Sequence, residues 1–320
     1  LATIQGGPYC LDPTAASCLP RLAVIGANSA VRGGGIFAAQ DADIQVDFAN
    51  VSANTAREAG GGLFVTGSRL RFGGLGSTFP SFDRSLCPEG ICEVLSGNRV
   101  EDNEGLAGSG GAIYANTAEI ALVDALVEDN LAGTAHAIRV DDGTAILQQV
   151  LLRQPDDPLP DAGIAATFDQ SVVTIRRSTL VVEPAAVAIP AAAGGHANAE
   201  PPIPQTIIEA FGAALTVTDS VIAGFGTAVE PVFLGPGAVL SGGCNAHAGT
   251  NVPAALSAIS MVIDRQAFAD GDGYTPRAGS VLLDRCSGAE VLPGARDIRG
   301  QSRRVSQPGG AVNTPMDIGA

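Results

Sequence analysis

The sequence contains no Trp and no Lys, and only 4% of its residues are aromatic. Its 18 basic residues are therefore all Arg, against 33 acidic residues, which gives a net charge of -15. Nucleic acid and anionic membrane surfaces require a basic face, so we expect neither as a partner. A core with so few rings must be built from Val, Ile, Leu and Ala, whose small shapes suit repetitive stacking.

Long apolar runs are also missing from the chain. The most apolar stretch, residues 179–193, is interrupted by Glu183, Pro184 and Pro190. It is too short and too broken to cross a bilayer, so we expect no transmembrane segment. The sequence begins with Leu1 and shows no signal peptide, as expected of a mature or trimmed product.

The cysteines fall into three close or late pairs, which are Cys10 with Cys18, Cys87 with Cys92, and Cys244 with Cys286. An even number and local spacing favour disulfides, and hence export through an oxidising compartment. Metal binding is the alternative, because His247 follows Cys244 closely, but no second ligand pair of this kind lies nearby. We therefore expect these three disulfides.

Internal repetition is the strongest signal in the sequence. Gly-rich openings recur at residues 33–37, 60–64 and 110–114, with weaker copies at 137–139 and 163–165. The apolar anchors of these openings are Ile36, Leu63, Ile113, Ile138 and Ile164. The first two anchors are 27 residues apart, and the last three are separated by 25 and 26 residues, a period that fits one coil of a solenoid. We expect the five anchors to stack on one another.

Two further short apolar segments follow in each coil. The alternation of Ile44, Val46 and Phe48 predicts a second strand with one buried face. Its counterparts are 70–72, 120–122, 146–147, 173–175 and 215–217, and the third segment recurs at 51, 126–127, 150–152, 180–182 and 221–222. The sequence therefore predicts an all-β, single-domain, right-handed parallel β-helix with three short strands per coil and an irregular C-terminal cap.

Asn residues occupy several of the expected turns, at Asn54, Asn98, Asn103 and Asn130. Asn tolerates left-handed backbone angles, so it suits a sharp corner. Asn residues stacked in successive coils would share side-chain amide hydrogen bonds. We expect a structural role for them rather than glycan or ligand binding.

Two stretches break the repeat, near residues 73–92 and 184–206. Long loops in a solenoid project from one face and often form the functional surface. We expect the solenoid to occupy residues 1–263 with these two insertions. Residues 264–320, rich in Gly, Arg, Asp and Pro, are expected to close the same domain as its cap.

The chain resembles two kinds of bacterial surface β-helix. The openings at 33–37, 60–64 and 110–114 are similar to polymorphic outer-membrane protein repeats. The end of the chain resembles the tail of choice-of-anchor Q domain proteins, through the segments 272–276, 279–284, 297–301 and 317–320. Arg285 and Cys286 depart from that pattern, which has small residues there. The resemblance implies a right-handed β-helix that is secreted or held at the cell surface, and it implies no reaction.

Enzymes that act on polysaccharides also use the β-helix. The best catalytic candidates are His136, Arg139, Asp141 and Asp142, since a lyase needs a basic group beside carboxylates. In a strand, Arg139 and Asp141 would share a face, which a structural ion pair explains as well. The acidic residues 156–157 lie next to prolines and are typical of a turn. We expect a structural role for the cluster.

A calcium site is a further option. Asp270 and Asp272 alternate as oxygen ligands do in calcium loops, but the downstream Glu of an EF-hand is missing. A plain turn is the simpler interpretation. We expect that no cofactor is required, with calcium as the one candidate ion.

Together these features predict an extracellular or cell-surface protein with a structural, adhesive or interaction role and no catalytic activity. Its expected partner is an extracellular polysaccharide or a protein surface, with self-association as another option. Two alternatives stay open. One is a carbohydrate-active lyase or hydrolase acting on acidic polysaccharide. The other is a subunit of an extracellular end-to-end assembly, because the ends of a solenoid are open sheet edges.

Overall fold

The fold is that of a computed structural model. It describes residues 2–5, 7–9, 19–74, 87, 91–102, 105–106, 108–154, 164–182, 205–225, 229–268, 274, 276–277, 280, 282, 286–287 and 315–316. The predicted turn residue Asn103 and most of the two loop insertions lie outside these residues.

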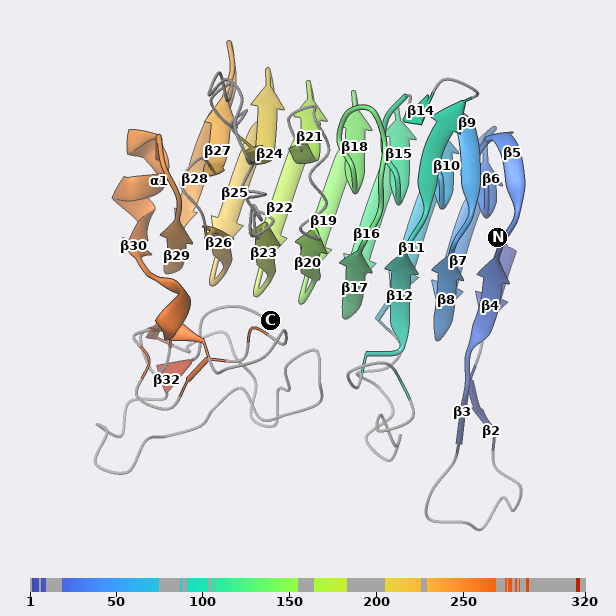
Figure 1. The fold of residues 1–320 in the computed structure, drawn as a ribbon, viewed down its shortest axis with the longest axis horizontal. Coiled ribbons are helices and arrows are strands. Elements are labelled where there is room, and N and C mark those ends of the chain that lie inside the picture. The colour runs from blue at the N-terminus through green and yellow to red at the C-terminus, as the bar shows by residue number, and fades with distance from the viewer. Residues whose placement is uncertain are drawn as a thin grey trace, which may run out of the picture.

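The chain is all-β and builds three long parallel sheets, called A, B and C here (Figure 1). Sheet A contains β1 (Ala2–Gln5), β7 (Asp43–Asp47), β11 (Arg69–Gly73), β16 (Glu119–Val123), β19 (Thr144–Gln148), β22 (Val172–Arg176), β25 (Ala214–Thr218) and β28 (Val239–Gly243). Sheet B contains β6 (Ile36–Ala38), β10 (Leu63–Thr66), β15 (Ile113–Asn116), β18 (Ile138–Asp141), β21 (Ile164–Asp169), β24 (Gln205–Phe211) and β27 (Val229–Leu234).

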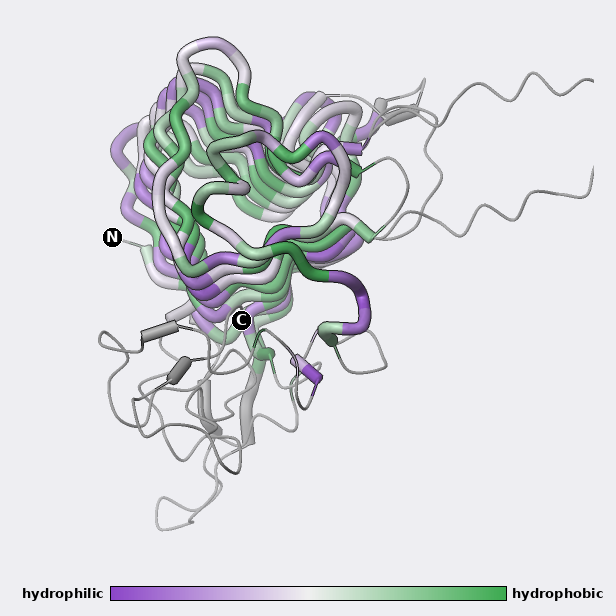
Figure 2. The backbone as a smooth tube through the Cα atoms, turned by 90° about the vertical axis from the view of Figure 1, so that its left-hand side faces the viewer, coloured by the Kyte–Doolittle hydropathy of each residue, from purple (hydrophilic) through white to green (hydrophobic). Residues whose placement is uncertain are grey.

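Sheet C contains β4 (Ala23–Gly26), β8 (Ala49–Ser52), β12 (Glu93–Ser96), β17 (Ala125–Glu128), β20 (Leu151–Gln154), β23 (Thr179–Val182), β26 (Val221–Gly224), β29 (Asn245–Ala248) and β30 (Ser260–Val262). A smaller sheet D holds β5 (Ser29–Arg32), β9 (Thr55–Ala59), β13 (Arg99–Asp102) and β14 (Gly105–Leu106). Successive strands visit sheets B, A and C in turn, and the first coils add a strand of sheet D. Figure 2 shows the coils superimposed along their stack.

The remaining described elements are short. Two antiparallel pairs are formed by β2 (Gly7–Tyr9) with β3 (Leu19–Arg21), and by β31 (Cys286–Ser287) with β32 (Pro315–Met316). The helix α1 (Ala254–Ile259) precedes β30, and a 3-10 turn, η4, covers Arg265–Ala267. In the described part of the chain, no helix is both long enough and apolar enough to span a bilayer.

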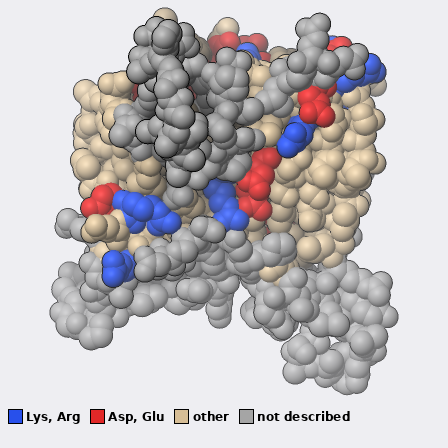
Figure 3. Space-filling view, in the orientation of Figure 1, with Lys and Arg blue, Asp and Glu red and all other residues tan. Residues whose placement is uncertain are grey.

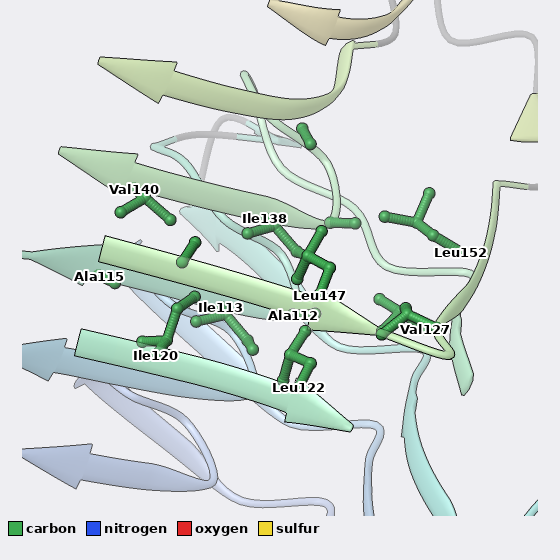
Figure 4. Packing of buried hydrophobic residues seen from close by; sticks show 14 of the residues in the cluster. Ala112, Ile113, Ala115, Ile120, Leu122, Val127, Ile138, Val140, Leu147 and Leu152 are labelled. Atoms are coloured by element: carbon green, nitrogen blue, oxygen red, sulfur yellow. The ribbon is translucent and has the colours of Figure 1, made fainter. Parts of the chain in front are cut away.

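Four of the five predicted anchors stack as expected. Ile36 pairs with Leu63, Leu63 with Ile113, and Ile113 with Ile138. All four are buried in one hydrophobic cluster with residues of sheets A and C (Figure 4). The segments predicted as second and third strands lie in sheets A and C respectively.

The prediction for Ile164 is wrong. Ile138 pairs with Ala166, and Ile164 pairs with Thr206 two positions away along the strand. The connection between β20 and β21 is longer here than in the preceding coil, so the constant spacing in sequence no longer matches the sheet register. Phe168 then adds a large buried ring, which compensates for the small Ala166 in the core.

The Gly-rich openings follow from the close approach of coils before β10. Gly60 has a φ of +64°, in the left-handed region that favours glycine. A Cβ atom on Gly61 would lie 2.5 Å from the carbonyl oxygens of Arg99 and Gly111. The motif therefore serves a sharp turn and backbone contact between coils, as the repeat pattern predicts.

The C-terminal end of the core is covered by Leu256 of α1, which is fully buried against the main cluster. The described residues after 263 lie elsewhere. Phe268, Tyr274 and Leu282 pack on outward-facing residues of sheet C, among them Leu126 and Leu151, in a second cluster. The boundary at residue 264 stays a prediction.

One predicted disulfide is present, between Cys87 and Cys92. Cys244 is also disulfide-bonded. The side chain of its predicted partner, Cys286, lies outside the described residues, and so do Cys10 and Cys18. These last two pairings stay predictions.

Candidate functional site

An open groove of about 520 Å³ runs over the outer faces of sheets B and D. Sheet B supplies the outward side chains of β6, β10, β15 and β18, and sheet D supplies those of β5 and β9. The lining residues are Arg32, Phe37, Glu58, Ala59, Phe64, Thr66, Gly108, Ser109, Tyr114, Asn116 and Arg139. The groove thus combines aromatic rings, hydroxyl and amide groups and two guanidinium groups.

Three aromatic rings form a ladder in the groove. Phe37, Phe64 and Tyr114 occupy the same register position in three successive coils. Their ring centroids are 5.3 Å apart in both steps, and the rings are stacked within 11° of parallel. The ring of Phe37 is 56% exposed, whereas Phe64 is buried. The ladder gives the groove a rigid apolar floor.

Arg139 and Asp141 share the outward face of β18, as the alternation of the strand predicts. The Arg139 Nε group donates to both carboxylate oxygens of Asp141, at 2.9 and 3.1 Å. The Tyr114 hydroxyl donates to Oδ2 of the same carboxylate at 2.8 Å. Burial, followed by this hydrogen bond and the charge of Asp141, raises the pKa of Tyr114 to about 12. Tyr114 is therefore a fixed hydroxyl donor at neutral pH.

A second ion pair lies on the opposite side of the ladder. The Arg32 Nε group donates to Oε2 of Glu58 at 2.6 Å, and both side chains are about half exposed. The Arg32 guanidinium also lies over the ring of Phe64, with its Cζ atom 5.5 Å from the centroid. The charges of Arg32 and Arg139 both act to lower the pKa of Tyr114. Two positive groups therefore flank the phenol.

The structure does not bring His136 and Asp142 to this pair. His136 is buried, and its Nδ1 atom accepts a hydrogen bond from the backbone N–H of Ala132 at 3.2 Å. Burial lowers its pKa from the ordinary value. Asp142 is at the corner after β18, where its φ is +52°. Of the four predicted candidates, only Arg139 and Asp141 form a surface site.

A carboxyl pair lies further along the same face. Arg139 pairs in register with Thr167, and Thr167 with Glu209. Burial and the nearby charge of Glu230 raise the pKa of Glu209, with Arg139 acting in the opposite direction. Burial also raises the pKa of Glu230. Sequence reasoning missed this pair, because the two residues lie in different coils with no shared motif.

The aromatic ladder was also missed, although its signal is present in the sequence. Each of the three clearest Gly-rich openings carries an aromatic residue one position after the anchor, at Phe37, Phe64 and Tyr114. The repeat pattern identified these residues only as parts of strands. Their stacking follows once the anchors are placed in register, because side chains at equivalent positions of neighbouring parallel strands lie side by side.

The proposed calcium ligands Asp270 and Asp272 lie outside the described residues. Within the described part of the chain, no group of three or more His, Cys, Asp or Glu side chains could hold a metal ion. On the face seen in Figure 3, acidic and basic side chains lie next to one another in an oblique row rather than in a patch of one sign.

Comparison with known proteins gave no match to any family model, to any curated protein or to any solved structure. The resemblance to choice-of-anchor Q domain proteins and to polymorphic outer-membrane protein repeats therefore stays a prediction. The functional argument consequently depends on the site itself.

Proposed function

We propose that this chain is a right-handed parallel β-helix protein, secreted or held at the cell surface, that binds an extended polysaccharide in the groove without cleaving it. The observation that supports this most directly is the ladder of Phe37, Phe64 and Tyr114 with an arginine ion pair on each side. Aromatic edges, hydroxyl groups and guanidinium groups are the side-chain types that contact sugar rings and their hydroxyls.

The handedness and location have separate support. Connections between parallel strands are right-handed in nearly all proteins, because the right-handed twist of strands favours that crossover. The disulfide between Cys87 and Cys92 and the bonded Cys244 fit a chain that folds in an oxidising compartment. Both features favour an exported β-helix of the type that the sequence resembles.

A polysaccharide fits the groove better than a peptide does. Extended peptides commonly bind by adding a strand to an unpaired sheet edge. The floor strands β10, β15 and β18 are already paired on both sides. Recognition must therefore come from side chains, and the groove offers Thr66, Ser109 and Asn116 for hydrogen bonds with sugar hydroxyls.

Binding without cleavage follows from the state of the candidate bases. Tyr114, with a pKa of about 12, keeps its proton at neutral pH and is a poor general base. His136 is buried, and its Nδ1 atom is already hydrogen-bonded. The guanidinium of Arg139 is held by Asp141.

A second candidate function, hydrolysis of the bound polymer, is favoured by one observation. The carboxyl group of Glu209 has a raised pKa, as a general acid requires, and it shares the outward face with Arg139. Glu230 would supply the second carboxylate of a hydrolase. This alternative predicts new reducing ends, which separates it from binding alone.

The test is affinity electrophoresis through gels that contain neutral or acidic polysaccharides. We expect at least one polymer to retard the wild-type protein, and Phe37→Ala to reduce the retardation. Phe233→Ala is the matched control, because Phe233 is 39% exposed on β27, outside the groove lining. Absence of retardation by every polymer, or equal loss in both variants, would contradict the proposal. Release of reducing ends that Glu209→Gln abolishes would establish the second candidate instead.

A further inference from the structure

We infer that the polymer recognised by the groove is acidic, a chain of uronate sugars whose carboxylates bind Arg32 and Arg139. The inference depends on the proposed function, because it names the chemical class of the polysaccharide. It starts from the positions of the two guanidinium groups, which lie on either side of Tyr114.

Both arginines keep hydrogen-bond donors for a ligand. An Arg side chain carries five N–H donors in a planar fork. Arg139 uses Nε for Asp141 and one Nη1 contact, 3.4 Å long, for the Ser109 hydroxyl. Arg32 uses Nε for Glu58. Within the described part of the chain, the remaining donors of both side chains make no hydrogen bond, and both residues line the groove.

The ion pair of Arg32 can exchange partners at little cost. Its side chain is 53% exposed and that of Glu58 is 52% exposed. Exposed pairs of this kind are weak, because water screens the charges and both side chains lose freedom when they pair. A ligand carboxylate can therefore share the Arg32 fork or replace Glu58. The planar fork matches a carboxylate better than it matches a single hydroxyl.

The spacing of the two arginines suits alternate units of an extended polymer. Arg32 lies over Phe64, on β10, and Arg139 is on β18, two strands further along sheet B. Neighbouring strands are roughly 4.8 Å apart, so the two positions are separated by roughly 10 Å along the coil stack. One strand spacing is close to the length of one sugar unit. A polymer lying along the stack would thus present every second carboxylate to an arginine.

General attraction cannot explain the binding of a polyanion to this protein, because the chain carries a net charge of -15. Long-range forces oppose the approach of an acidic polymer. Affinity must therefore come from local contacts in the groove. Substitution of one groove arginine should then have a much larger effect than substitution of an arginine elsewhere.

The test is isothermal titration calorimetry with oligogalacturonate and with the same oligomer fully methyl-esterified. Poly-glutamate serves as an acidic polymer without sugar rings. We expect oligogalacturonate to bind, and both Arg32→Gln and Arg139→Gln to weaken it by roughly tenfold or more. Arg69→Gln is the matched control, since Arg69 forms an exposed ion pair with Glu119 on sheet A, outside the groove. It should leave the affinity unchanged. Circular dichroism confirms that each variant is folded.

The outcomes separate this inference from the proposed function. If the esterified oligomer binds as tightly as the acidic one, the groove binds sugars but does not recognise their charge, and the inference is wrong while the function holds. If poly-glutamate binds as tightly as oligogalacturonate, charge alone is recognised and the uronate assignment is wrong. If neither oligomer binds and the electrophoresis also shows no retardation, both proposals fail.

Discussion

The side-chain amide of Asn54 donates a hydrogen bond of 2.9 Å to Oδ1 of Asn98 in the next coil, and both residues are fully buried. The same contact links Asn98 to Asn130 at 2.9 Å and Asn28 to Asn54 at 3.0 Å. Each of these acceptors also receives a backbone N–H, from Asn54, Asn98 and Asn28 respectively. The predicted ladder of asparagines therefore satisfies the buried polar groups at one corner of the coils.

The ladder predicts a strong effect of Asn98→Ala. The substitution leaves the amide donors of Asn54 and the carbonyl of Val51 without their partner in a buried corner. We expect the free energy of unfolding to fall by roughly 3 kcal/mol, because buried polar groups without partners are costly. Asn28→Ala is the control at the exposed end of the ladder, where water can replace the side chain. Equal loss in the two variants, measured by urea denaturation, would contradict the buried-ladder interpretation.

The close contact between coils predicts the result of Gly61→Ala. The added Cβ atom would meet backbone oxygens of two other segments at 2.5 Å, so the coils would have to separate. We expect a loss of roughly 3 kcal/mol of stability, or failure to fold. Gly243→Ala is the matched control, because a Cβ atom at that position meets nothing within 4 Å. Thermal unfolding of the two proteins checks the difference, and similar melting temperatures would count against the proposed role of the opening.

The fold could be predicted from local repetition as far as the repetition remained regular. Ile36, Leu63, Ile113 and Ile138 were placed correctly, because each follows a glycine turn at a constant distance. Ile164 was misplaced, because its spacing of 26 residues was a coincidence produced by a longer connection. The sheet D strands were not predicted, since they are short and carry no continuous apolar pattern.

The candidate site was only half predictable for a physical reason. Arg139 and Asp141 are two residues apart in one strand, so alternation alone places them on one face. Tyr114 and Arg32 join them from other coils, and that contact depends on the sheet register. His136 is only three residues from Arg139 in sequence, but it belongs to a corner that turns its ring into the protein.

The outer cluster on sheet C predicts a role for Arg265. Its guanidinium Cζ atom lies 5.1 Å from the ring centroid of Tyr274 and 5.9 Å from those of Phe225 and Phe268. We expect Arg265→Ala to lower the free energy of unfolding by about 1–2 kcal/mol through lost cation–π contacts. It should also increase hydrogen exchange around Phe268 more than elsewhere. Arg277→Ala, at an exposed position, is the control. Unchanged exchange near Phe268 would show that the cation does not hold this segment on the sheet.

The hydrogen bond between Tyr114 and Asp141 predicts an alkaline titration. The pKa of Tyr114 is about 12 in the fold against an ordinary value of 10.0, so its contribution to stability is complete below pH 10 and is lost as the pH rises towards 12. Ultraviolet absorbance should show a phase near pH 12 that Tyr114→Phe removes. Asp141→Asn should move this phase to lower pH, because it removes the negative charge that opposes ionisation. Asp169→Asn is the control, since Asp169 pairs with Asp141 in the sheet but does not bond to Tyr114. A phase that stays near pH 12 in Asp141→Asn would mean that burial alone holds the proton on Tyr114.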